Sequence, residues 1–223
     1  MPRSSTTAQL TMAQRIASVA MGVVLIGVFA WVGYAALNPQ PSPLQEALRS
    51  LASSNEDDST AAAAYTDAFD ASYRPDAGVG NVAIAAVYYT PQVQAALNAL
   101  PKKSAHQDEL ASVLDQEGAN DQALAFYTMI DSVVSQVGID LAAAASLTDG
   151  DGRSYALMSS RPIYALLPQP EGQVRTTTVL FFAATADDGT AFSRQTVSEL
   201  TLTVRDVADI PERRFRWDLR LVP

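Results

Sequence analysis

The amino-acid sequence predicts an α+β protein in which an N-terminal transmembrane helix is followed by a helical segment and a C-terminal antiparallel β-meander. Two observations predict this architecture. Residues 16–37 form one uncharged apolar run, and the spacing of apolar residues then changes from helical, over residues 60–147, to alternating, over residues 153–222. We therefore expect a cytoplasmic tail (1–15), a transmembrane helix (16–37), a linker with a short helix (38–59) and one extracytoplasmic α+β domain (60–223).

The apolar run is long enough to cross a bilayer. Its 22 residues would extend about 33 Å as a helix, and the hydrocarbon core is about 30 Å thick. Arg3 and Arg15 precede the run, and the first charge after it is Glu46. The positive-inside rule therefore predicts a single-pass protein of the cytoplasmic (inner) membrane, with its N-terminus inside and its domain outside. The alternative is a cleaved signal peptide, although the apolar core of a signal peptide is usually only about 7 to 15 residues. Ser18 and Gly22 are small residues four positions apart, where a second membrane helix could pack closely.

Charge and cysteine content exclude several kinds of site. The chain has no cysteine and one histidine, which removes disulfides, thiolate metal sites and histidine-based zinc or haem sites. Residues 40–150 carry 15 acidic and 4 basic residues, a net charge of −11, whereas residues 151–223 carry nine of each. An acidic surface repels phosphate groups, so we expect no nucleic-acid partner. We also expect no cofactor and no metal.

Local signals predict three helices, at residues 60–73, 91–100 and 104–117. The first has helical apolar spacing and ends at a turn signal. Thr90 is a suitable N-cap for the second, with Pro91 at its first position. Ser104 and Gln107 have the spacing of a capping box for the third, which Gly118 terminates.

The rest of the helical half is less uniform. Residues 82–89 fit either a helix or a strand, because their alanines favour a helix and their branched and aromatic residues favour a strand. Asn120 is expected to cap a further helix, since apolar residues follow at three- or four-residue intervals from Leu124 to Val137. Another helix is expected over residues 139–147.

Alternation of apolar and polar residues predicts the strands, at residues 153–158, 163–167, 174–185 and 192–207, with a last strand up to residue 222. A hairpin signal at Asp187, Asp188 and Gly189 is expected to join the third and fourth of these strands. In the last strand, the positions expected to face the core are Phe215, Trp217, Leu219 and Leu221.

No residue pattern predicts catalysis. Ser104, His106 and Asp108 have the side chains of a nucleophile, a base and an orienting acid, but residues two apart on a helix diverge by about 200° and cannot meet. Helix capping explains Ser104, and solvent exposure is expected for His106. The turn that begins at Asp149 is similar to the start of a calcium loop, but its twelfth position is Ser160 and not the required glutamate. We therefore predict no catalytic, cofactor-binding or metal site.

Four arginines gather on or beside the last strand: Arg213, Arg214, Arg216 and Arg220. One interpretation is a solvent face whose charges guard a sheet edge against strand addition. The other is an interaction surface for an acidic partner, including the acidic half of a neighbouring copy of the chain. The sequence leaves both open, and a homo-oligomer fits the second.

Helices followed by a long antiparallel sheet on a membrane-tethered domain resemble the nuclear-transport-factor-like (cystatin-like) fold of envelope proteins. The segments that carry this likeness are Val179-Leu180-Phe181-Phe182, Leu200-Thr201-Leu202-Thr203-Val204 and Phe215-Arg216-Trp217-Asp218-Leu219. They are similar to segments of the Mce-associated membrane proteins and of the VirB-type assembly factors of type IV secretion. The resemblance implies a non-catalytic scaffold that oligomerises or docks other subunits.

The sequence therefore favours a non-catalytic accessory, scaffold or assembly subunit of a bacterial cell-envelope membrane complex, with other membrane-protein subunits as partners. The alternative is a membrane-anchored domain that binds a lipid or small molecule in a cavity between helices and sheet. Its expected apolar lining includes Tyr127, Phe181 and Trp217.

Overall fold

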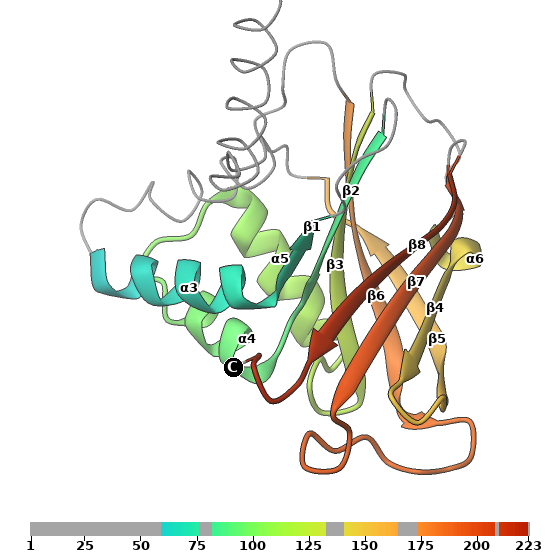
Figure 1. Ribbon diagram of the computed structural model, residues 1–223. Helices are drawn as coiled ribbons and strands as arrows, with labels where there is room; N and C mark the ends of the chain where they lie inside the picture. The colour runs from blue at the N-terminus through green and yellow to red at the C-terminus, as the bar shows by residue number, and fades with distance from the viewer. Residues whose placement is uncertain (1–58, 76–81, 133–140, 165–173, 208–209, 223) are drawn as a thin grey trace, which may run out of the picture. The chain divides into compact units, whose positions relative to one another are not determined.

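The computed structural model describes residues 59–75, 82–132, 141–164, 174–207 and 210–222 (Figure 1). The helices are α3 (Ser59–Ser72), α4 (Pro91–Asn98), α5 (Ala105–Gln116) and α6 (Leu141–Ala144). The strands are β1 (Tyr73–Pro75), β2 (Val82–Tyr88), β3 (Ala123–Ser132), β4 (Ala145–Asp149), β5 (Ser154–Pro162), β6 (Val174–Ala186), β7 (Glu199–Val207) and β8 (Ile210–Asp218).

All eight described strands form one antiparallel sheet in the order β1-β2-β3-β6-β5-β4-β7-β8. Strand β6 pairs with β3 on one side and with β5 on the other. Strand β4 pairs with β5 and with β7. Strands β4, β5 and β6 are consecutive in sequence and adjacent in the sheet. The next strand, β7, returns to lie beside β4, which makes these four strands a Greek key.

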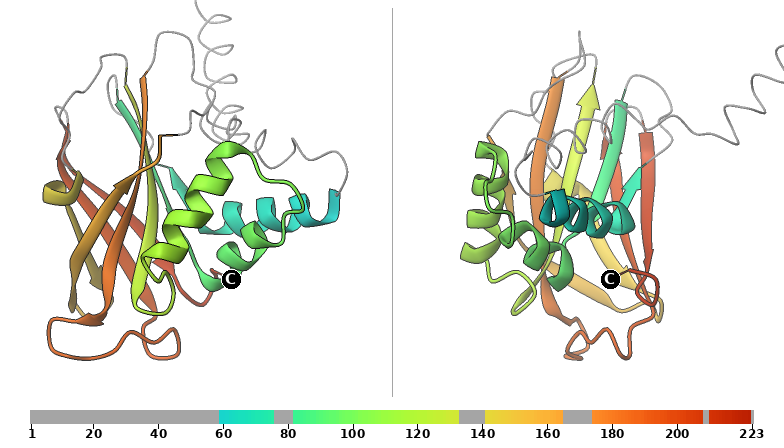
Figure 2. Two further views of the ribbon diagram at one scale, coloured as in Figure 1. Left: turned by 180° about the vertical axis from the view of Figure 1, so that it is seen from behind. Right: turned by 90° about the vertical axis from the view of Figure 1, so that its left-hand side faces the viewer.

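The sheet curls into a near-barrel, so its two faces meet different partners. Figure 2 shows that α3, α4 and α5 gather on one side of the sheet. Residues on this face of β2, β3 and β6 form one core with the helices: Tyr65, Phe69, Val93, Leu97, Leu110, Leu114, Val87, Tyr127 and Phe181 are among its members. The alternate residues of the same strands point the other way, as the two-residue period of a strand requires.

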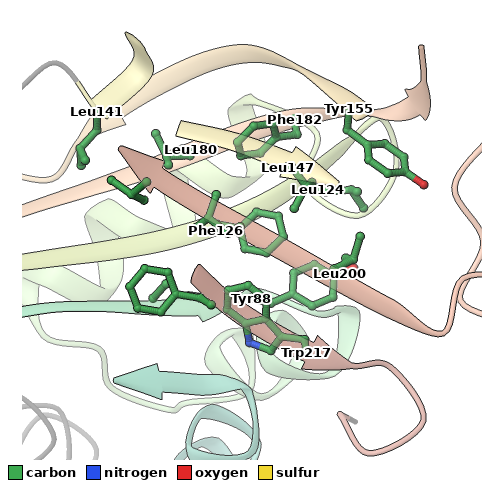
Figure 3. Packing of buried hydrophobic residues seen from close by; sticks show 14 of the residues in the cluster. Tyr88, Leu124, Phe126, Leu141, Leu147, Tyr155, Leu180, Phe182, Leu200 and Trp217 are labelled. Carbon is green, nitrogen blue, oxygen red and sulfur yellow. The ribbon is translucent and has the colours of Figure 1, made fainter. Parts of the chain in front are cut away.

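That second face encloses another core, which fills the inside of the curled sheet (Figure 3). Phe126 on β3 lies at its centre, with its ring 5.0 Å from Tyr88 and 5.1 Å from Trp217 between ring centroids. Strands β7 and β8 contribute Leu200, Leu202, Val204, Phe215, Trp217 and Leu219. Leu221, expected on the same face, is instead 77% exposed, because β8 ends at Asp218 and the chain turns.

Side chains join the two edge regions of the sheet where the strands come round toward each other. Trp217 Nε1 on β8 donates a hydrogen bond to the Ser72 carbonyl at 2.6 Å. Arg74 Nε on β1 donates to the Arg216 carbonyl at 3.0 Å, and Arg213 Nη2 donates to the Val82 carbonyl at 3.1 Å. We call this region the seam; it satisfies edge carbonyls that would otherwise be open to strand addition.

The expected α+β architecture, a helical half followed by a β-meander, is wrong. The described domain is mostly antiparallel sheet with few helices, and three of its strands, β1, β2 and β3, lie inside the segment 60–147 that was expected to hold the helices. Helices do form at the three sites with local signals, as α3, α4 and α5, with the capping box at Ser104. Every residue of β3 is buried, because helices cover one face and the second core the other. A strand buried on both faces is apolar throughout, so its periodicity carries no reliable signal.

Three further details differ from the sequence predictions. Asn120 adopts a left-handed conformation (φ 67°) in the turn before β3 and caps no helix. The turn at Asp187 to Gly189 closes only a short loop, with a bridge between Thr185 and Ala191, and β6 does not pair with β7. The strand expected at residues 153–158 extends to Pro162 as β5 and contains bulges, whereas Ile163 and Tyr164 belong to no strand and the rest of the strand expected at 163–167 lies outside the described residues. Long-range pairing, and not local turn chemistry, decides these points.

None of the helices in the described ranges is long and apolar enough to cross a membrane. The predicted transmembrane helix at residues 16–37 lies outside the described residues.

Candidate functional site

A small pocket lies between the helix layer and the sheet. Tyr65 on α3, His106 on α5 and Tyr127 on β3 line it, together with Tyr89, Phe69, Gln107 and Leu110. Its volume for water-sized spheres is about 10 Å³, which is room for about one water molecule. A pocket of this size does not accommodate a lipid or a drug-sized ligand, which needs about 300 Å³ or more.

Hydrogen bonds join the polar groups of this pocket in two pairs. The Tyr65 and Tyr89 hydroxyls are 2.8 Å apart, and the Tyr127 hydroxyl is 2.8 Å from Nε2 of His106. Burial raises the pKa of Tyr65 to about 12 and raises the pKa values of Tyr89 and Tyr127 well above their usual value. These phenols stay neutral at physiological pH, so they are poor proton donors to a substrate.

His106 is buried, contrary to the expectation of solvent exposure. The helical period explains its position, since His106, Gln107, Leu110 and Leu114 all lie on the buried face of α5. Ser104 serves the capping box and not a triad with His106 and Asp108. No sequence signal indicated the contact between His106 and Tyr127, because Tyr127 lies on β3 and was expected on a helix.

A buried ion pair joins β3 to β6 on the face that the helices cover. Arg175 Nε lies 2.7 Å from Asp131 Oδ1, and Arg175 Nη2 donates to Asp131 Oδ2 at 2.8 Å. The two side chains are only 2% and 6% exposed. Two parallel hydrogen bonds of this kind fix the relative position of the strands. This geometry gives the pair a structural role, which is to hold β3 against β6.

The residues expected to line a ligand cavity do not meet. Tyr127 and Phe181 belong to the core beneath the helices, whereas Trp217 belongs to the core inside the curled sheet. The sheet itself lies between them. Of the three, Tyr127 alone borders the small pocket.

The four arginines of the predicted interaction surface are separated by the structure. Arg213 is 6% exposed and serves the seam. Arg214 and Arg216 are exposed and on the outer face of β8, opposite Phe215 and Trp217. Arg220 follows the strand, where it pairs with Asp218 at 2.6 Å and lowers the pKa of that carboxyl to about 2. Only Arg214 and Arg216 therefore share one surface.

Two other arginines join them from elsewhere in the chain. Arg205 on β7 bonds to Glu212, which also pairs with Arg214, at 2.9 and 2.6 Å. Arg74 reaches the Arg216 carbonyl across the seam. We call Arg74, Arg205, Arg214 and Arg216 the arginine face. Sequence reasoning missed Arg74 because it is distant in the chain, and it missed Arg205 because that residue lies on the neighbouring strand β7.

The arginine face has a net positive charge. Among the residues that the structure describes, Glu212 is the only carboxylate within 4.0 Å of its guanidinium groups. The side chains of Arg205 and Arg214 are 55% and 54% exposed. The core that packs against α3, α4 and α5 draws on β2, β3 and β6 (Figure 1) and contains no residue of β7 or β8, so these helices do not pack on Arg205, Arg214 or Arg216.

The turn at Asp149 is a structural turn. Asp149 Oδ1 accepts hydrogen bonds from the backbone N–H groups of Asp151 and Arg153, and Oδ2 accepts from the Tyr155 hydroxyl. Within the described ranges, no group of three or more His, Cys, Asp or Glu residues could hold a metal ion. The predicted helix-packing residues Ser18 and Gly22 lie outside the described residues.

No family model matches the chain, and no curated protein or solved structure matches it either.

Proposed function

We propose that the chain is a non-catalytic accessory, scaffold or assembly subunit of a bacterial cell-envelope membrane complex, anchored by residues 16–37 in the cytoplasmic membrane. The observation that carries this proposal is the arginine face, an exposed and positively charged surface on a rigid pair of strands. Uncompensated charges of one sign on such a surface favour an oppositely charged protein partner. A relationship to the Mce-associated or VirB-type proteins would fit this role and stays a prediction.

The interior of the domain favours a scaffold over the alternative, a lipid-binding or small-molecule-binding domain. Aromatic side chains fill the space inside the curled sheet, where Phe126 contacts Tyr88, Phe182 and Trp217. The pocket beneath the helices has room for about one water molecule. The buried titratable groups described there are engaged with one another, as in a packed core.

The test is gentle detergent extraction of the tagged full-length chain, followed by native mass spectrometry and identification of the bound components. We expect membrane proteins in fixed stoichiometry with the wild-type chain and their loss from R214E/R216E. R220E is the control, because Arg220 is even more exposed than Arg214, at 76% against 54%, and lies just beyond β8, outside the arginine face. A wild-type monomer that carries a lipid or small molecule, and no protein, would contradict the proposal.

A further inference from the structure

The helix layer carries a net charge opposite to that of the arginine face; Asp67 lies on α3, Asp108 and Asp115 lie seven residues apart on one side of α5, and Asp121 follows α5. Helix α3 and residues 91–121 together carry seven acidic and two basic residues, a net charge of −5. Four of the carboxylates are exposed: Asp67, Asp108, Asp115 and Asp121. We call these four the acidic helix surface.

No cation in the described part of the chain neutralises the acidic helix surface. No described cation lies within 4.0 Å of Asp67, Asp108, Asp115 or Asp121, and the one side-chain bond of Asp115 is from the neutral amide of Gln94. By contrast, Glu117, which ends α5, already pairs with Arg161 on β5. The carboxylates of Asp67, Asp108, Asp115 and Asp121 can therefore meet a partner's cations.

The arginine face is similarly incomplete. Arg205 and Arg214 share one carboxylate, Glu212, while the guanidinium groups of Arg74 and Arg216 have no carboxylate partner among the described residues. The four arginines and Glu212 therefore have a net charge of +3. The core beneath the helices contains no residue of β7 or β8, although Trp217 on β8 bonds to the last residue of α3. Among the described residues, no carboxylate of the acidic helix surface pairs with the arginine face, and a second copy can supply that partner.

We propose that the partner of the arginine face is the acidic helix surface of a second copy of this chain. The inference rests on the proposed function and names one partner of the same surface. Because the two surfaces are different, the contact is heterologous, and each added copy leaves one surface of each kind open. Copies anchored in one membrane would thus form a row or a ring.

The proposal predicts a specific pattern of self-association for the full-length chain in mild detergent. The wild-type chain forms a series of species that extends beyond the dimer, and high salt dissociates them because exposed charges are screened. R214E/R216E alters one surface and D67K/D115K the other, so each variant alone associates roughly tenfold or more weakly and is mainly monomeric. R220E, whose arginine already pairs with Asp218, associates like the wild-type chain.

Mixing the two variants is the decisive measurement by native mass spectrometry. R214E/R216E keeps an intact acidic helix surface and D67K/D115K keeps an intact arginine face, so an equal mixture forms a one-to-one dimer that grows no further. Misfolding of either variant cannot produce this result. The proposal is overturned if the wild-type chain is monomeric at low salt, if its association is unaffected by either variant, or if the mixture stays monomeric.

The outcomes also separate this inference from the proposed function. In one outcome, the wild-type chain does not self-associate but binds other membrane subunits, and R214E/R216E loses them. That outcome would overturn the inference and leave the accessory role standing. Association that persists in high salt and in both variants would point to packing elsewhere in the chain and would also overturn it.

Discussion

The buried Asp131–Arg175 pair allows the sharpest test of the fold. We consider R175M, which removes the guanidinium and keeps a long apolar side chain. Arg175 donates to Asp131 through two bonds of 2.7 and 2.8 Å, and both side chains are almost fully buried. R175M leaves the Asp131 carboxylate buried without its cation, which costs about 3–5 kcal/mol of unfolding free energy. That is a large part of the roughly 5–15 kcal/mol that stabilises a typical domain.

The matched control is the double variant D131L/R175M. Replacing both members of a buried pair with apolar side chains is often neutral or stabilising, because no charge is left without a partner. We therefore expect the double variant to recover most of the stability that R175M loses. The difference between the single and double variants isolates the cost of the unpaired carboxylate from any effect of packing.

Denaturant unfolding of the chain in detergent measures these free energies, with extrapolation to zero denaturant. The chain has two tryptophans, Trp31 and Trp217, and Trp217 is fully buried in the core. A W31F background makes Trp217 the only tryptophan, whose emission can be excited selectively over that of the tyrosines. If R175M loses less than about 1 kcal/mol, or if D131L/R175M is as unstable as R175M, then water reaches the pair and the unpaired-carboxylate argument is wrong.

Three further predictions follow from single contacts. W217F removes the donor to the Ser72 carbonyl and should lower the unfolding free energy by about 1–3 kcal/mol, measured by near-ultraviolet circular dichroism in denaturant; no loss would argue against the seam. S104A removes the N-cap of α5 and should cost about 1 kcal/mol, with faster hydrogen exchange at the first turn of α5 and unchanged exchange in β3. In an alkaline titration, the Tyr65 phenol should ionise only near pH 12, because burial raises its pKa to about 12. Because this folded-state pKa lies above the unfolded value of 10.0, the contribution of Tyr65 to stability is complete below pH 10.0 and is lost as pH rises toward about 12. Tyrosinate absorbance that rises in a single step near 10.0 would contradict this burial.

Local signals identified the elements whose ends are defined by neighbouring residues. The capping box at Ser104, the N-cap at Thr90 and the stop at Gly118 all have the expected geometry. The alternation in β7 also assigned its buried face correctly, with Leu200 and Leu202 inside. These features depend on contacts within a few residues, which the sequence specifies directly.

Strand β3 could not be predicted from local sequence patterns, because it is buried on both faces. Phe126 and Ile130 face the inside of the curled sheet, whereas Tyr127 and Met129 face the helices. Because both sets are apolar, the sequence shows no alternation, and chance spacing of Leu124, Tyr127 and Ile130 resembles a helix. The buried position of His106 was missed for the same reason, since its partner is on this strand.

The sequence by itself determined the apolar run, the uneven charge, the lack of cysteine and the helices with strong caps, because each depends on composition or on near neighbours. Only the tertiary structure decided which strands pair, and therefore which arginines share a surface. Arg213 and Arg214 are adjacent in sequence, yet one is buried at the seam and the other exposed, because successive strand residues point to opposite faces. Arg74 meets Arg216 although 142 residues separate them. Contacts between distant segments depend on how the whole chain packs, and no local pattern encodes them.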